Sequence, residues 1–106
     1  MRVFLSQPMN GRSDQEILNE RQEILELLQT KFLDVELLDT FFTDACQWGP
    51  LQCLGKAIEL LADADCAFFA AGWEQARGCR IEHACCEEYK IRILYDGSFA
   101  HDQKIP

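Results

Sequence analysis

Two segments of the chain gather side chains that could bind a ligand or react with one. The first covers residues 72–83 and contains a Trp, two Gly, two Arg and two Glu. Trp73 could stack on a base or a sugar. Glu82, four residues after Gly78, could reach a bound ligand from the start of a helix. The alternative is a solvent-facing helical Glu that the positive end of the helix dipole stabilises.

The second segment runs from Ser6 to Ser13 and leads into a helix. Ser13 and Glu16 have the S-x-x-E spacing of a capping box, which marks a helix start. Free backbone N–H groups, the helix dipole and Arg12 could together hold an anion there. Since the segment is neither a G-x-G-x-x-G fingerprint nor a P-loop, a plain turn before a capped helix is the alternative.

The Cys and His positions do not predict a metal site. The six cysteines show no C-x-x-C spacing, and we expect their thiols to be reduced. Cys79 and His83 could share a helix face, but two ligands are too few for a structural zinc. We expect His83 to be exposed or hydrogen-bonded by neighbours. Asp65 is expected to serve a turn and to accept a backbone N–H.

The elements that position these segments follow from the hydrophobic pattern, which alternates between strand and helix spacing. Strands are expected at 2–6, 34–39, 66–71 and 91–95, and helices at 13–31, 50–62 and 78–89. The run 66–71 is almost continuously apolar, which is typical of a strand covered on both faces. The loop 40–49 is unusually apolar, with Phe41, Phe42, Cys46 and Trp48.

This β-α-β-α-β-α-β alternation predicts an α/β fold with parallel strands, right-handed crossovers and helices on both faces of the sheet. We expect a four-stranded sheet of order 2-1-3-4, a reduced doubly wound arrangement. Ligands of such sheets bind beyond the carboxyl ends of the strands, at the switch point between the first and third. The rule selects the loops 7–12 and 72–77, which are the two segments introduced above.

Length and charge restrict the functions that are open to the chain. Its 106 residues are enough for one domain, which we assign to residues 1–95, with a polar tail at 96–106. The net charge of -8 argues against a nucleic-acid polymer as a partner, although a small nucleotide needs only one or two donors. Without a long apolar run or the features of a signal peptide, we expect a cytoplasmic protein with no membrane contact.

Several motifs, read together, carry a resemblance to a known family. They are Phe4 to Gly11, Leu54-Gly55-Lys56, Ala64-Asp65, and Gly72-Trp73-Glu74-Gln75-Ala76-Arg77-Gly78-Cys79-Arg80-Ile81-Glu82. From Arg2 to about Leu94 the chain resembles a domain-of-unknown-function family of small bacterial and phage proteins, which is related to the nucleoside 2-deoxyribosyltransferases. The last block is the most specific of these motifs.

The resemblance implies a three-layer, flavodoxin-like Rossmannoid fold and a glutamate nucleophile that attacks C1′ of a deoxynucleoside or deoxynucleotide. Glu82 matches that glutamate by position. The base leaves, a glycosyl-enzyme ester forms, and a second base or water resolves it, as in retaining glycosidases. No cofactor or metal is implied. The substrate-binding residues would be Ser6, Gln7, Pro8, Met9, Asn10, Gly11, Arg12, Gly72, Trp73, Glu74, Arg77 and Gly78.

Within that set the resemblance suggests more specific roles. Arg12 or Arg77 would meet a 5′-phosphate, and Trp73 would lie near the base. The chain also departs from the characterised enzymes: Phe4 stands where they carry a Tyr that hydrogen-bonds the nucleophile, and Gln7-Pro8 stands where many relatives have Gly-Pro. For the acid that protonates the leaving base, Glu74 is the nearest candidate.

These departures leave two functions open: an N-glycosidic enzyme, either a deoxyribosyltransferase or an N-hydrolase, and a non-catalytic nucleotide-binding module of the same fold. A protein-binding role for the acidic surface is a weaker third interpretation. The small-molecule partner would be a nucleoside or nucleotide. Because a four-stranded sheet leaves edges to protect and the loop 40–49 is apolar, we expect at least a homodimer.

Overall fold

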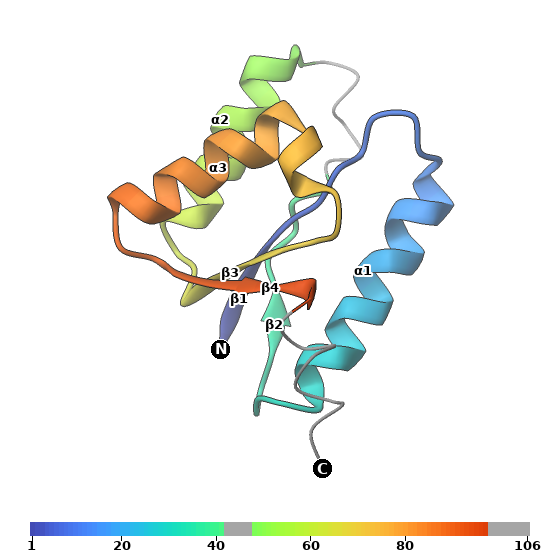
Figure 1. Cartoon of the computed structure of the whole chain (residues 1–106), viewed down its shortest axis with the longest axis vertical. Helices are drawn as coiled ribbons and strands as arrows, with labels where there is room; N and C mark the ends of the chain where they lie inside the picture. Colours follow the sequence, from blue (N-terminus) through green and yellow to red (C-terminus); the bar gives the residue numbers. More distant parts are fainter. Residues whose placement is uncertain (42–47, 98–106) are drawn as a thin grey trace.

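A four-stranded sheet forms the middle layer of the protein. The computed structural model describes residues 1–41 and 48–97, which include this sheet and the helices around it (Figure 1). Helix α1 (Asp14–Gln29) lies against one face of the sheet, and α2 (Pro50–Leu61) and α3 (Arg77–Glu88) lie against the other. The chain is therefore a three-layer, Rossmann-like α/β protein, as the alternating pattern predicted.

The strands run parallel in the order β2-β1-β3-β4, which confirms the expected order. Their bounds are Arg2–Ser6 for β1, Glu36–Leu37 for β2, Cys66–Phe69 for β3 and Arg92–Tyr95 for β4. In the register of β1 and β3, Ser6 is paired with Phe69. Both central strands therefore end at the same edge of the sheet, where this fold class binds ligands.

Strand β1 is buried on both faces, and its side chains alternate between two cores. Val3 and Leu5 pack with Ile24 and Leu28 of α1. Phe4 packs in the other core, which includes Cys86 of α3. The same alternation places Ser6 on the face that α3 covers.

The helix starts follow the sequence closely. Ser13 Oγ accepts the backbone N–H of Glu16 at 3.1 Å, and Glu16 Oε1 accepts that of Ser13 at 3.0 Å, so the predicted capping box is present. Helix α1 ends at Gln29, two residues before the expected end. Pro50 opens α2, as is common for proline in a first turn. Asp65 Oδ2 accepts the backbone N–H of Arg2 at 2.7 Å, which confirms its expected role.

Three strands are shorter than predicted: β4 begins one residue late, at Arg92, and β2 and β3 lose more because turns lie next to them. Asp34 has a φ of 53°, a left-handed conformation that no strand residue adopts, so β2 cannot begin there. Strand β3 stops at Phe69, and the segment expected as a plain loop contains a 3₁₀ turn, η2 (Trp73–Gln75). Gly72, with a φ of 86°, makes the bend into that turn possible.

Part of the sequence interpretation falls outside this description. Phe42 and Cys46 of the apolar loop lie outside the described residues, and so does most of the predicted polar tail, from residue 98 onward. Among the helices of the described ranges, none has both the length and the apolar character needed to cross a bilayer.

Candidate functional site

Glu82 is buried at the carboxyl edge of the sheet rather than exposed on its helix. It lies in the second turn of α3 and is only 8% exposed. Ser6, the last residue of β1, donates a hydrogen bond from its Oγ to Glu82 Oε1 at 2.6 Å. This contact joins residues 76 positions apart in sequence. The solvent-facing alternative for Glu82 is therefore wrong.

Burial also changes the acidity of this carboxyl group. It raises the pKa of Glu82 to about 7, and the hydrogen bond from Ser6 opposes that rise. Among the described residues no Lys, Arg or His side chain forms an ion pair with Glu82. Near neutral pH both the acid and the carboxylate forms are thus accessible, which is the condition that suits proton transfer or nucleophilic attack.

A cleft with a volume of about 1320 Å³ opens above this carboxyl group. Its walls come from the loop after β1, the first half of α2 and the start of α3. Many of the predicted site residues line it: Gln7, Pro8, Met9, Asn10, Arg12, Arg77, Gly78 and Glu82. Residues 75–82 of one segment and most of residues 7–12 of the other therefore meet around one cleft, at the edge that the rule predicts.

Trp73 and Glu74 line a different hollow, of about 610 Å³, together with Gly72 and Tyr95. The Trp73 ring stacks on the His83 ring, with centroids 4.2 Å apart and planes inclined by 15°. The 3₁₀ turn after Gly72 directs Trp73 toward His83 and Phe69 instead of the Glu82 cleft. This placement corrects the expectation that Gly72, Trp73 and Glu74 would line one cleft with Glu82.

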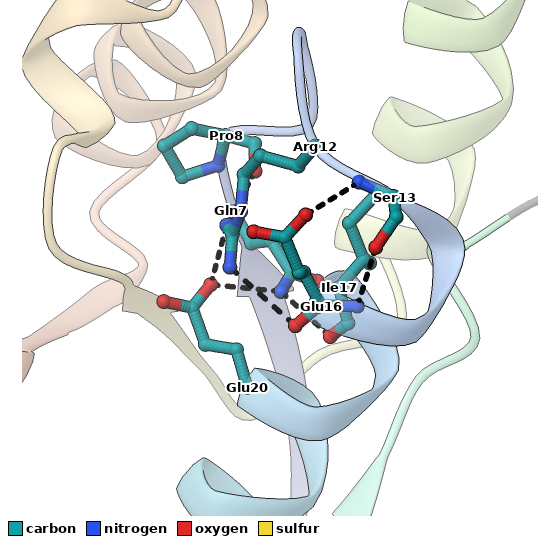
Figure 2. A network of polar contacts seen from close by, with 7 residues as sticks. All are labelled: Gln7, Pro8, Arg12, Ser13, Glu16, Ile17 and Glu20. Atoms are coloured by element: carbon teal, nitrogen blue, oxygen red, sulfur yellow. Dashed lines mark hydrogen bonds and ion pairs between the residues drawn. The ribbon is translucent and has the colours of Figure 1, made fainter.

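Arg12 is held by partners of its own chain (Figure 2). Its Nη1 donates to Glu20 Oε1 at 2.9 Å and to the carbonyl oxygen of Pro8 at 2.8 Å. Arg77, in contrast, is exposed in the cleft wall and forms no ion pair within the described ranges. Of the two arginines proposed for a phosphate, Arg12 therefore stabilises the loop, and Arg77 keeps its charge available.

Gln7 belongs to the same network and is 6% exposed. Its Nε2 donates to the carbonyl oxygen of Ile17 at 3.1 Å and to Glu20 Oε1 at 2.8 Å (Figure 2). The side chain thus links the end of β1 to the first turns of α1. Sequence inspection placed Gln7 in the site but gave no sign of Glu20, because their contact is formed only when α1 packs on the sheet.

Cys79, one helical turn before Glu82, also lines the cleft. Burial raises the pKa of its thiol to about 11, against the effect of a hydrogen bond with Ser6. Cys79 therefore stays a thiol at neutral pH and is a poor nucleophile. The other described cysteines, Cys53, Cys66, Cys85 and Cys86, are free as well.

No group of three or more metal-ligating side chains gathers in residues 1–41 and 48–97. His83, considered with Cys79 as a possible metal pair, instead contacts the hydroxyl of Tyr95 through Nε2 at 2.7 Å. Its Nδ1 lies 3.5 Å from Glu87 Oε1. These contacts agree with the expectation of a histidine satisfied by its neighbours.

The hydrogen bond between Ser6 and Glu82 is the contact of the candidate site that the sequence interpretation missed. The Ser6 hydroxyl bonds Glu82, a contact that the resemblance attributes to a first-strand Tyr, where this chain has Phe4. The signal was present in the period of two along β1, since Phe4 and Ser6 share the face covered by α3.

No model of a known protein family matches the chain, and no curated protein and no solved structure matches it either.

Proposed function

We propose that the protein cleaves the N-glycosidic bond of a nucleoside or nucleotide, with Glu82 as the nucleophile. The observation that carries the proposal is a carboxyl group that is buried beside a large cleft, forms no ion pair with the described residues, and accepts a hydrogen bond from the Ser6 hydroxyl. A carboxylate in such a place can attack an electrophilic carbon and stabilise positive charge that develops on a sugar ring.

The proposed reaction has two steps. In the first, a carboxylate oxygen of Glu82 bonds to C1′ while the C1′–N bond breaks. The bonding electrons leave with the base, which takes up a proton. In the second step, water or another base attacks C1′, displaces the Glu82 carboxylate and loses a proton. Because Ser6 occupies Oε1, Oε2 is the oxygen that remains to attack.

The net charge of -8 also favours a small ligand over a nucleic-acid polymer. Within the cleft, the exposed Arg77 guanidinium is a suitable partner for a phosphate group on such a ligand. We therefore include 5′-monophosphates among the proposed substrates. The setting that we propose is cytoplasmic, with the protein assembled as a homo-oligomer.

One observation favours a second function, a nucleotide-binding module without catalysis. Glu74, the candidate for protonating the leaving base, lines the other hollow. In the described part of the chain, the carboxyl groups that line the cleft are those of Asp14 and Glu82, and Asp14 is exposed at the start of α1. A site without a positioned acid for the leaving base could bind the ligand and leave the bond intact.

The test is incubation with a panel of nucleosides, deoxynucleosides and their 5′-monophosphates, with and without an acceptor base, followed by chromatography of free base. We expect base release from at least one compound and its loss in Glu82→Ala. Glu88→Gln, which alters an exposed glutamate of the same helix, is the matched control and should retain activity. Binding of a compound by calorimetry without base release would favour the binding module, and release that persists in Glu82→Ala would refute the proposal.

A further inference from the structure

The side-chain amide of Gln7 has its orientation fixed by its neighbours. Both atoms near Nε2, the carbonyl oxygen of Ile17 and Glu20 Oε1, are hydrogen-bond acceptors. If the amide were turned over, Oε1 would face these two oxygens and both hydrogen bonds would be lost. The amide nitrogen therefore faces α1, and Oε1 takes the other position.

In that position Oε1 has no hydrogen-bond partner among the described residues, and it is shielded from solvent. A buried acceptor without a donor costs free energy, and native proteins rarely keep one without a reason. Arg12 belongs to the same network, but its Nη1 donates to Glu20 and Pro8 and its Nη2 to the carbonyl oxygen of Glu16, and it forms no hydrogen bond with Gln7 Oε1. The protein thus maintains an unused acceptor, on an amide that cannot be turned over without losing two hydrogen bonds, at a residue that lines the Glu82 cleft.

The chemistry of the missing donor follows from the surroundings. The cation of this network, Arg12, is already neutralised by Glu20, so the position does not call for a further charge. A neutral donor such as a hydroxyl fits it best. Ser6, the residue before Gln7, holds the carboxylate that would react at C1′. In a nucleoside the hydroxyl groups belong to the sugar, so a hydroxyl that pairs with Gln7 Oε1 would be one of the sugar's.

We propose that Gln7 is a specificity-determining residue whose Oε1 accepts a hydrogen bond from a hydroxyl of the ligand's sugar. The inference rests on the proposed function, because it takes the ligand to be a nucleoside or nucleotide. The contact requires a small rotation of the terminal amide torsion, which is a soft one, to bring Oε1 to the cleft surface. A sugar that lacks this hydroxyl leaves the acceptor unpaired and binds more weakly.

The experiment measures binding by calorimetry, so that it does not depend on turnover. The probes are adenosine and uridine, together with the analogues of each that lack the 2′-, the 3′- or the 5′-hydroxyl group. The parents and their 2′- and 3′-deoxy analogues are also tested as 5′-monophosphates. We expect one deoxy analogue to bind about tenfold more weakly than its parent, the loss typical of one hydrogen bond. That analogue identifies the hydroxyl.

Three variants separate Oε1 from the rest of the side chain. Gln7→Met removes the acceptor and the donor, whereas Gln7→Lys removes the acceptor and keeps a donor toward Ile17 and Glu20. In both variants the affinities for the parent nucleoside and for the deoxy analogue should differ by less than about twofold, because the affinity for the parent falls. Glu20→Gln leaves Oε1 in place and should keep the difference. Thermal unfolding identifies any variant that fails to fold.

The outcomes distinguish this inference from the proposed reaction. Equal affinity of the wild type for every parent and analogue overturns the inference even if base release depends on Glu82. A difference that persists in both Gln7 variants overturns it as well. A difference that depends on Gln7, without any base release, supports the inference and counts against the reaction. A wild type that binds none of the probes overturns both.

Discussion

At the scale of single residues, Glu82 shows how burial affects a carboxyl group that has no ion-pair partner in the described part of the chain. Water would stabilise the carboxylate, but at 8% exposure Glu82 has little access to water. One hydroxyl, that of Ser6, replaces part of that hydration and only partly offsets the loss. The charged form that the proposed reaction needs is therefore held at a cost, which should be visible in stability.

We predict that Glu82→Gln changes how stability depends on pH. The folded pKa of Glu82 is about 7, above the value of 4.5 for an unburied Glu. Its contribution to stability is complete below the unfolded pKa and is lost as pH rises through the folded one. Relative to the wild type, the variant should therefore gain up to about 3 kcal/mol between about pH 5 and about pH 8.

Chemical denaturation at a series of pH values checks this prediction through the difference between the two free energies of unfolding. Glu88→Gln is the control, since that side chain is exposed on the same helix, and its difference from the wild type should not vary with pH. Parallel curves for Glu82→Gln and the wild type would mean that the carboxyl group is not desolvated in the folded protein.

The residues of the site were predictable to different degrees. Glu82 could be placed at the correct sheet edge from the position of its helix, because strand order and the edge rule fix that location. Trp73 could not, since its side chain follows the 3₁₀ turn toward His83 and Phe69. Such a turn depends on contacts with other elements, which a local pattern does not encode. The pairing of Arg12 with Glu20 was missed for the same reason.

At the scale of elements, Gly72 lies in the turn after β3, close to Pro8 in the loop after β1. Its φ of 86° is in the left-handed region, and a Cβ at this position would lie 3.7 Å from Pro8 Cγ, an ordinary contact. The obstacle to a side chain is thus the backbone conformation alone. Gly55, in the middle of α2, has an open position with no atom within 4 Å of a Cβ.

These two glycines give opposite predictions for the same substitution. Gly72→Ala should destabilise the protein by about 1 kcal/mol, because a side chain is strained at positive φ. Gly55→Ala should stabilise it by about 1 kcal/mol, because alanine has the higher helix propensity. Urea denaturation measures both changes in the free energy of unfolding, provided that its slope against urea concentration is the same as in the wild type. Equal effects of the two substitutions would contradict the left-handed turn at Gly72.

Element bounds were predictable wherever a local chemical signal marks them. The capping box of α1 and the proline of α2 gave their helix starts to within one residue. Strand ends were less accurate: β2 was expected to cover six residues and has two, since the turn at Asp34 is left-handed. Apolar residues continue past both ends of β2 because Val35 and Leu38 pack in the cores. An apolar residue can thus pack in a core without pairing in the sheet, so the apolar pattern overestimates the length of β2.

At the scale of the whole molecule, the surface near α2 bears on assembly. Leu51, in the first turn of α2, is 79% exposed. It follows the apolar loop 40–49, of which Phe41 and Trp48 are described and half-buried. Phe41 and Leu51 both line the Glu82 cleft, and exposed apolar side chains close to one another are typical of contacts between proteins.

We predict from this surface that the protein forms at least a dimer, and that Leu51→Glu weakens it. A charge at a buried apolar contact would be desolvated without a partner, so the variant should dissociate at concentrations where the wild type does not. Leu33→Glu is the matched control, because Leu33 is 88% exposed in the turn after α1, and the end of α1 lies at the opposite edge of the sheet from the start of α2 (Figure 1). Light scattering over a concentration series measures both. A wild type that stays monomeric at high concentration would refute the dimer, and equal dissociation of both variants would place the contact elsewhere.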